Sequence, residues 1–323
     1  MDFNYTTLKS IQNTLPENKQ QAKRYYGKHP YFTTRAWNVV HDYIQNFSQP
    51  GDTVLDPFGG SGVTAVEALI LRRKGLHVDL SPLSVFLAEQ TAISPINLGE
   101  AGEAFSRVKS VCEHTINDWF SMKDEEVRKL TIQYWYPKDI ALPSNADVQY
   151  VHELFTSKQL ISLAYLHDVI MQEKQEILRN LLLLTFSATL GKTNRTFLSA
   201  SGRKESRGGS AIFSHYRYYV PDSPVELNVW EQFNMRWDGI LKAKKETNEK
   251  IGDFYNAEDF RAINGSATEL TDFIPEESVD YVFTDPPYGA HIAYLDLATM
   301  WHAWMRSEIS NNNKSKEAIE GVK

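Results

Sequence analysis

The chain has 323 residues, a formal net charge of −7, and 42% hydrophobic and 12% aromatic residues. This length is enough for two domains with a sizeable core, and the aromatic content argues against general disorder. The single cysteine, Cys112, excludes an internal disulfide and favours a reducing compartment. Residues 1–4 begin no signal peptide, and the longest apolar run, residues 181–186, is too short to cross a bilayer. We therefore expect a cytoplasmic protein.

The first 55 residues predict the start of an α/β sheet. A polar lead-in ends near residue 24, and apolar residues recur at helical spacing over residues 34–48. A turn at residues 48–52 then leads into an apolar strand that begins at Thr53.

A glycine-rich turn follows this strand, with the sequence Asp-Pro-Phe-Gly-Gly-Ser-Gly at residues 56–62, and a helical pattern comes next. Its glycines allow unusual backbone angles and the close approach of a ligand, and Ser61 or Thr64 can cap the helix. Ligands of open α/β sheets bind outside the carboxyl ends of the strands. The turn is neither a G-x-G-x-x-G fingerprint nor a P-loop, so we expect no pyrophosphate. Asp56 instead favours a cation or a polar amino group.

A second strand is predicted over residues 74–79 and ends in Asp79. An acidic residue about 20 positions beyond a glycine-rich turn commonly binds ribose hydroxyls in Rossmann-type sheets. The alternative is that Asp79 and Ser81 only cap the helix that follows.

A mostly helical insertion is predicted over residues 99–255, and part of it is basic although the chain as a whole is acidic. Cations contact phosphates and aromatic rings stack on bases, so this part is a candidate DNA contact. The alternative is a solvated loop that leads into an edge strand. The candidate nucleic-acid-binding residues are Lys192, Arg195, Arg203, Lys204, Arg207, Tyr216 and Arg217.

The tetrapeptide Asp285-Pro286-Pro287-Tyr288 ends an apolar strand over residues 279–284. The prolines end strand pairing and stiffen the turn, which places a carboxylate beside an aromatic ring. Such a pair suits a planar ring that bears an amino group, such as a nucleobase. An ordinary proline-rich turn is the alternative.

Together these motifs resemble the S-adenosylmethionine-dependent DNA amino-methyltransferases, over roughly residues 25–95 and 258–305. The family's cofactor loop resembles residues 56–62, and its catalytic motif resembles the tetrapeptide at Asp285. The segment at residues 27–33 resembles the one that the family places against the methionine end of the cofactor. The turn at residues 264–268 resembles the one that lines the adenine pocket, although the family often has an acidic residue where Ser266 stands.

The resemblance implies two sets of site residues and no metal. The catalytic residues are Asp285, Pro286, Pro287 and Tyr288. The residues that bind S-adenosylmethionine are Tyr31, Phe32, Thr33, Asp56, Pro57, Phe58, Gly59, Gly60, Ser61, Gly62, Asp79, Leu80, Ser81, Ser266 and Ala267.

The implied reaction is methylation of the exocyclic amine of an extruded base. In the family an aspartate at the motif's first position is commoner for adenine, so adenine is favoured over cytosine. A restriction-modification setting is also suggested by the resemblance. The rivals are an RNA amino-methyltransferase and a non-catalytic subunit that binds DNA or a partner. A nicotinamide oxidoreductase is disfavoured by the glycine spacing.

The predicted fold class is α/β: a Rossmann-like methyltransferase sheet, limited to its first four strands, that the helical insertion interrupts. The predicted domains are residues 1–98 with the cofactor loop, 99–255 as the target-recognition insertion, and 256–323 with the catalytic motif. After that motif we expect one helix and a polar tail, although family members need further strands. An unpaired strand would expose polar backbone. We therefore expect a second polypeptide or a second copy to complete the sheet, unless the chain is a fragment.

Overall fold

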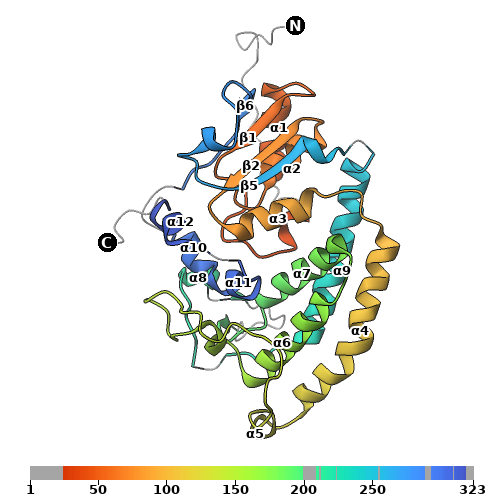
Figure 1. Ribbon diagram of the computed structural model, residues 1–323, viewed down its shortest axis with the longest axis vertical. Helices are drawn as coiled ribbons and strands as arrows, with labels where there is room; N and C mark the ends of the chain where they lie inside the picture. Colours follow the sequence, from red (N-terminus) through yellow and green to blue (C-terminus); the bar gives the residue numbers. More distant parts are fainter. Residues whose placement is uncertain are drawn as a thin grey trace. The chain divides into compact units, whose positions relative to one another are not determined.

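A parallel four-stranded sheet organises the part of the chain that carries both motifs (Figure 1). The structure is a computed structural model, and it describes residues 25–198, 209–210, 212–222, 224–253, 255–287, 292–307 and 309–317. The chain forms two compact units. The first comprises Met1–Ile96, Lys242–His291 and Ile309–Lys323, and the second comprises Asn97–Leu241 and Ile292–Glu308.

The first unit alternates strands and helices. Its elements are η3 (Tyr25–Gly27), α1 (Trp37–Phe47), β1 (Thr53–Asp56), α2 (Val63–Ile70), β2 (Lys74–Asp79), α3 (Pro82–Ala92), the last part of α9 (Val229–Ile251), η5 (Ala257–Asp259), β5 (Phe260–Asn264), η6 (Leu270–Asp272), β6 (Tyr281–Val282) and α12 (Asn311–Ser315).

The strand order is β5-β2-β1-β6, and each neighbouring pair is parallel. Asp56 at the end of β1 pairs with His77 of β2, and Asp79 at the end of β2 pairs with Asn264 of β5. Parallel strands point their carboxyl ends to one edge of the sheet. The α/β class and the four predicted strands are therefore confirmed.

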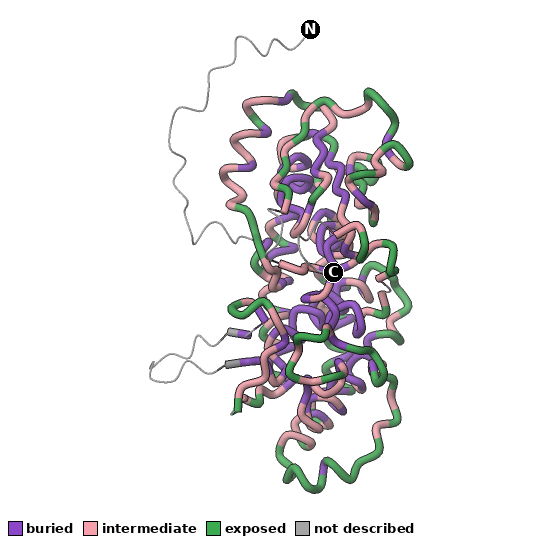
Figure 2. The backbone as a smooth tube through the Cα atoms, turned by 90° about the vertical axis from the view of Figure 1, so that its left-hand side faces the viewer, coloured by how far each residue is buried: buried purple, intermediate pink, exposed green. Residues whose placement is uncertain are grey.

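Alternate residues of β1 face opposite sides of the sheet, as strand geometry requires. Val54 packs with Val40 and Ile44 of α1 and with the apolar residues of α2. Leu55 packs on the other side, in a smaller cluster with Val78. The central strands β1 and β2 are mostly buried, whereas β5 and β6 at the edges of the sheet are largely half-buried or exposed. Figure 2 shows that buried and exposed residues alternate along much of the chain.

One residue of α9 fastens the end of α3. Lys244 is buried, and its ammonium group donates to the backbone carbonyls of Thr91 (3.2 Å) and Ile93 (2.9 Å). A cation at a helix C-terminus satisfies carbonyls that lack partners within the helix. Burial nevertheless lowers the pKa of Lys244 to about 7.

The second unit is mostly helical. Its elements are α4 (Leu98–Ser121), α5 (Asp124–Val127), η4 (Val151–Leu154), α6 (Ser157–Met171), α7 (Glu176–Leu190), β3 (Phe197–Leu198), β4 (Gly209–Ser210), α8 (Ile212–His215), the first part of α9, α10 (Tyr294–Leu297) and α11 (Thr299–Trp304).

The core of the second unit lies around α7, whose residues from Leu181 to Leu190 are all buried. Trp301 of α11 donates its indole N–H to the Ser187 carbonyl at 2.9 Å. The ring of Phe105 stacks on Trp237 of α9, with centroids 4.8 Å apart. The helical prediction is wrong for much of residues 128–150, where the structure has turns, bends and one isolated bridge. The predicted polar tail likewise contains the short helix α12.

Candidate active site

The four strands bring polar residues together at the carboxyl edge of the sheet (Figure 1). Asp56 ends β1, Asp79 ends β2, and Asn264 ends β5. The chain continues from β6 through Phe283 and Thr284 to Asp285. Because ligands of open α/β sheets bind outside this edge, it is the place where a binding site is expected.

Asp56 connects the glycine-rich turn to the segment that carries Asp285. Its carboxylate accepts hydrogen bonds from the Phe58 N–H (3.1 Å), the Thr64 hydroxyl (2.7 Å) and the Thr284 hydroxyl (2.8 Å). Burial raises the pKa of Asp56, and the two hydroxyl groups oppose this shift. Thr284 lies 228 positions from Asp56 and directly precedes Asp285. The two motifs therefore lie at the same edge of the sheet.

The turn at residues 56–62 is held closely against its neighbours. Gly60 and Gly62 have φ angles of +53° and +84°, which glycine adopts readily. A side chain on Gly62 would also lie 2.8 Å from the Cβ of Ala88 in α3. The predicted cap by Ser61 or Thr64 is wrong: Gly62 is the N-cap residue of α2, no side chain caps it, and the Thr64 hydroxyl bonds to Asp56 instead.

The predicted methionine-end segment lies beside this turn. A Cβ atom on Gly60 would be 3.5 Å from the ring of Tyr31, so that ring covers the turn. The rings of Tyr31 and Phe32 are 5.7 Å apart, and Thr33 is exposed. Phe58, at the start of the turn, is 37% exposed and therefore accessible to a ligand.

Asp79 already has two partners in the main chain. Its carboxylate accepts from the N–H groups of Gly60 and Ser81, both at 2.8 Å. The Ser81 hydroxyl caps α3 by accepting from the Ser84 N–H at 3.5 Å, and Leu80 is half-buried. Burial raises the pKa of Asp79 to about 6, although the hydrogen bonds from the Ser81 and Gly60 N–H groups oppose this rise. Each carboxylate oxygen can accept more than one hydrogen bond, so ribose binding by Asp79 is compatible with this geometry.

The charge of Asp79 provides a pH test. Its folded-state pKa exceeds the ordinary value of 3.8, so ionisation costs stability that is regained as the pH falls below about 6. We expect the stability of Asp79→Asn relative to the wild type to be about 1–3 kcal/mol more favourable at pH 8 than at pH 4, because only the wild type has a buried charge at pH 8. Urea denaturation at both pH values measures this, and equal differences at the two would contradict it. The same variant should bind S-adenosylmethionine about tenfold more weakly by calorimetry.

The turn predicted to line the adenine pocket is satisfied internally. Ser266 is buried, and its hydroxyl lies 2.8 Å from the Thr268 hydroxyl and accepts from the Thr268 N–H at 3.2 Å. Ala267 is half-buried beside it. The side chain of Asn264 donates to the Asp79 and Leu80 carbonyls, which ties this turn to the end of β2.

Asp285 forms an ion pair with Arg35, a residue that the sequence analysis did not select. The side chain of Arg35 is 52% exposed and that of Asp285 is 25% exposed. Pro286 is exposed and Pro287 is half-buried, while Tyr288 lies outside the described residues. The position of Arg35, two residues after Thr33, could have pointed to the site. Its charge could not, because any of the many arginines in the sequence could pair with Asp285.

Comparisons with known proteins agree with this arrangement. A family model described as DNA methylase, for the N6 and N4 methyltransferases, matches residues 4–90, which include β1, the glycine-rich turn and β2. The N-terminal part of the chain is therefore similar to the DNA amino-methyltransferases. S-adenosylmethionine is the methyl donor of that family.

Several curated relatives carry the name type II methyltransferase. M.MvaI of Kocuria varians is 25% identical over 270 residues, which cover 80% of this chain and 52% of that protein. M.MjaII of Methanocaldococcus jannaschii is 31% identical over 75 residues, or 23% of this chain and 14% of that protein. M.HinfI of Haemophilus influenzae is 29% identical over 98 residues, or 27% of each. The chain thus spans about half or less of the length of these relatives, and no solved structure matches it.

The residues predicted to contact DNA lie in the second unit, and the two described arginines among them have structural partners. Arg217 pairs with Asp147 at 2.7 Å, Arg195 donates to the Glu153 carbonyl at 2.9 Å, and Lys192 is half-buried with its pKa lowered by burial. Tyr216 is 43% exposed. Arg203, Lys204 and Arg207 lie outside the described residues.

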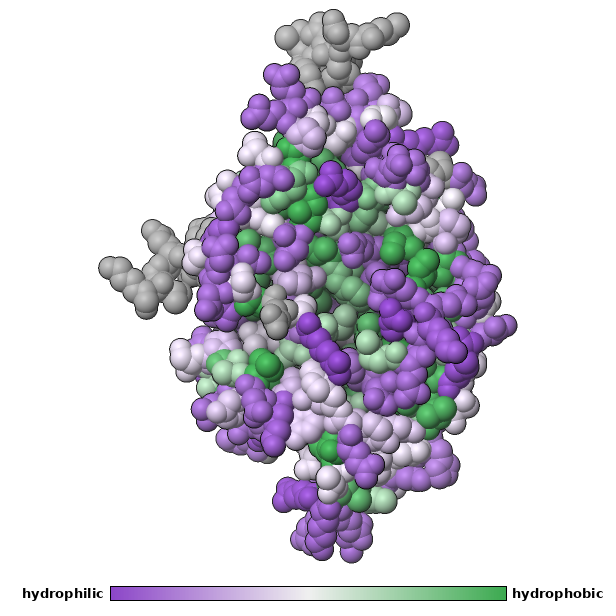
Figure 3. All heavy atoms as spheres, in the orientation of Figure 1, coloured by the Kyte–Doolittle hydropathy of each residue, from purple (hydrophilic) through white to green (hydrophobic). Residues whose placement is uncertain are grey.

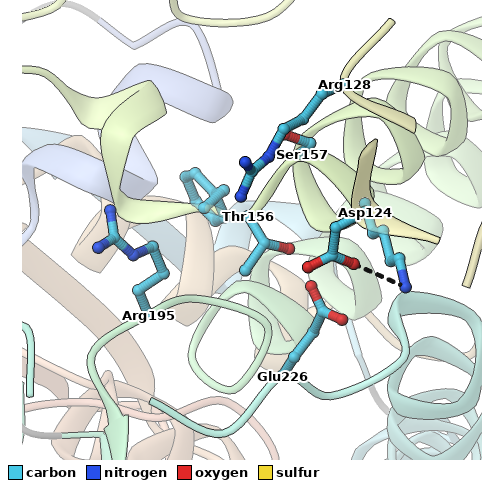
Figure 4. A pocket seen from close by; sticks show the side chains of 8 residues that line it. Asp124, Arg128, Thr156, Ser157, Arg195 and Glu226 are labelled. Atoms are coloured by element: carbon cyan, nitrogen blue, oxygen red, sulfur yellow. Dashed lines mark ion pairs between the residues drawn. The ribbon is translucent and has the colours of Figure 1, made fainter. Parts of the chain in front are cut away.

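Arg195 also lines a pocket of about 320 Å³ in the second unit (Figure 4). Arg128 points into this pocket, and the carboxylates of Asp124 and Glu226 lie near each other. Asp124 is paired with Lys158 at 3.0 Å. Because both signs of charge line it, the pocket is polar without being a simple anion site.

No helix in the described ranges is long and apolar enough to cross a membrane. In the same part of the chain, no group of three or more acidic, histidine or cysteine side chains is arranged to hold a metal ion.

Proposed function

We propose that this chain is a DNA methyltransferase that transfers a methyl group from S-adenosylmethionine to the exocyclic amine of adenine. The hydrogen bond from Thr284 to Asp56 carries this proposal, because it unites the cofactor loop and the catalytic segment at one edge of the sheet. The description DNA methylase of the family model that matches residues 4–90 supports DNA as the substrate. The first unit then performs catalysis, and the second reads the target.

The proposed methyl transfer requires the acceptor amine to be oriented more than it requires the methyl group to be activated. S-adenosylmethionine supplies a methyl group that its sulfonium already activates. The residues must therefore align the acceptor nitrogen and exclude water. The carboxylate of Asp285 and the carbonyl of Pro286 can accept hydrogen bonds from the two N–H groups of the amine. These bonds stabilise the positive charge that develops on nitrogen. The ion pair with Arg35 is proposed to keep this carboxylate at the sheet edge.

Stacking on Tyr288 is proposed to hold the extruded base. Such stacking is worth about 1–3 kcal/mol, and extruding a base from a duplex costs a similar few kcal/mol. The two terms nearly cancel, so the base can enter the site without a large net penalty.

Methyl incorporation tests the proposal directly. Purified chain, labelled S-adenosylmethionine and duplex DNA should yield N6-methyladenine after digestion to nucleosides and mass spectrometry. N4-methylcytosine in its place would overturn the choice of base. Structured RNA added as a competitor should not divert the label, and preferential labelling of that RNA would favour the RNA enzyme.

The basic part of the second unit is proposed to contact DNA phosphates. Arg195→Gln should weaken duplex binding and lower the slope of log affinity against log salt by about one unit. Arg179→Gln is a matched control, since Arg179 also donates to a backbone carbonyl, that of Glu173, at 3.0 Å. Fluorescence anisotropy over a salt series measures both, and equal behaviour of the two variants would contradict a DNA contact by Arg195.

The prediction that another polypeptide or a second copy completes the sheet remains a proposal. Among the described residues β6 pairs only with β1, and Val282 is 49% exposed. Figure 3 shows hydrophobic side chains on the surface over the strands of this sheet. Parallel strands are usually covered on both faces of their sheet. The exposed hydrophobic surface over these strands therefore supports contact with a further polypeptide. Light scattering after size-exclusion chromatography tests self-association, and a monomer that methylates DNA alone would rule out an obligate partner.

A further inference from the structure

Gly59 is required for space rather than for its backbone angles. Gly60 and Gly62 have positive φ angles, whereas Gly59 does not. A Cβ atom on Gly59 would lie 2.1 Å from Nδ1 and 2.3 Å from Cε1 of His77, and real Cβ atoms do not approach so closely. The imidazole of His77 therefore occupies the space of a side chain at position 59.

His77 is held there by a chain of two hydrogen bonds. It is fully buried in β2, and its Nε2 lies 3.0 Å from the hydroxyl of Ser84 in α3. That hydroxyl donates to the Gly60 carbonyl at 2.5 Å. Since the single hydroxyl proton goes to Gly60, the hydrogen-bond network assigns the proton of His77 to Nε2, which donates to Ser84.

The other ring nitrogen, Nδ1, is buried and has no hydrogen-bond partner among the described residues. A second proton would lie there with no acceptor, and burial lowers the pKa of His77 to about 3. The imidazole is therefore neutral at physiological pH, and it acts through its shape and one N–H group.

Hydrogen bonds consequently hold both peptide groups that flank Gly60. Its carbonyl accepts from Ser84, and its N–H donates to the Asp79 carboxylate at 2.8 Å. Gly60 also lies against the ring of Tyr31. The orientation of these two peptide groups thus depends on β2 and α3 rather than on the turn alone.

We infer that His77 and Ser84 are positioning residues for the cofactor loop: the imidazole fills the space beside Gly59, and the Ser84 hydroxyl fixes the Gly60 carbonyl for binding of the methyl donor. The inference rests on the proposed function in one respect, that the loop binds S-adenosylmethionine. A purely structural role in the core would affect stability without coupling residue 59 to residue 77.

A double-mutant cycle tests this coupling in the full chain. Gly59→Ala should raise the dissociation constant for S-adenosylmethionine at least about tenfold, because the methyl group collides with the imidazole. His77→Ala should raise it about fivefold. The double variant should bind more tightly than Gly59→Ala alone, since the smaller side chain makes room for the methyl group. If the double variant instead shows the product of the two separate losses by calorimetry, the inference is wrong.

Hydrogen exchange gives a readout that needs no cofactor. In Ser84→Ala and in His77→Ala, amides of residues 58–62 should exchange at least about tenfold faster than in the wild type. Thr91→Val is the control, because its hydroxyl lies on the same helix and bonds to the Leu87 carbonyl at 2.7 Å. Unchanged loop exchange in both variants would overturn the inference, whether or not the wild type binds S-adenosylmethionine. A wild-type chain that binds no S-adenosylmethionine would instead overturn the proposed function.

Discussion

Asp285→Ala is expected to reduce methyl transfer at least about a thousandfold while the affinity for S-adenosylmethionine changes less than about threefold. Asp285 follows β6, and its carboxylate is the proposed acceptor for the amine of the extruded base. The hydrogen bonds that join the cofactor loop to Asp56, Asp79 and Ser84 do not involve Asp285, so this variant keeps them. Single-turnover methylation and calorimetry measure the two quantities separately.

Arg35→Gln is the informative control for this experiment. If Asp285 served only as the partner of Arg35, loss of either residue would have the same effect. Both side chains are partly exposed, so breaking the ion pair should change stability by less than about 1 kcal/mol. We therefore expect Arg35→Gln to retain most of the activity. An Asp285→Ala enzyme with more than a tenth of wild-type turnover would refute the catalytic role.

Asp56→Ala is expected to abolish both cofactor binding and activity, with a loss of about 2–4 kcal/mol in the free energy of unfolding. The change leaves the Thr64 and Thr284 hydroxyls and the Phe58 N–H without their acceptor. Relief of the buried charge offsets part of this loss, since burial raises the pKa of Asp56. Urea denaturation and calorimetry measure the two effects.

Two single variants separate the functions of Asp56. Thr64→Val removes the bond within the loop, and Thr284→Val removes the bond that reaches the catalytic segment. We expect the first to weaken cofactor binding more and the second to lower turnover more. Equal effects of both variants on both quantities would mean that Asp56 has only a general role in stability.

Much of the first unit could be predicted because its signals are local. The strand before Asp56, the glycine-rich turn and the helix after it lie within 18 consecutive residues, and the structure contains each of them. The Ser81 cap of α3 is local as well. The cap proposed for α2 was wrong although it was also local, because Thr64 bonds to the buried Asp56 and not to the first turn of its own helix.

The sequence by itself determined which residues can form a cofactor loop and a catalytic turn, since glycines, prolines and acidic groups act on their immediate neighbours. It did not determine that Thr284 bonds to Asp56, that Arg35 pairs with Asp285, or that His77 fills the space beside Gly59. Those contacts join residues far apart in the chain. In the folded sheet β1 lies between β2 and β6. This strand order depends on packing of the whole sheet and not on local propensity, so only the tertiary structure decides it.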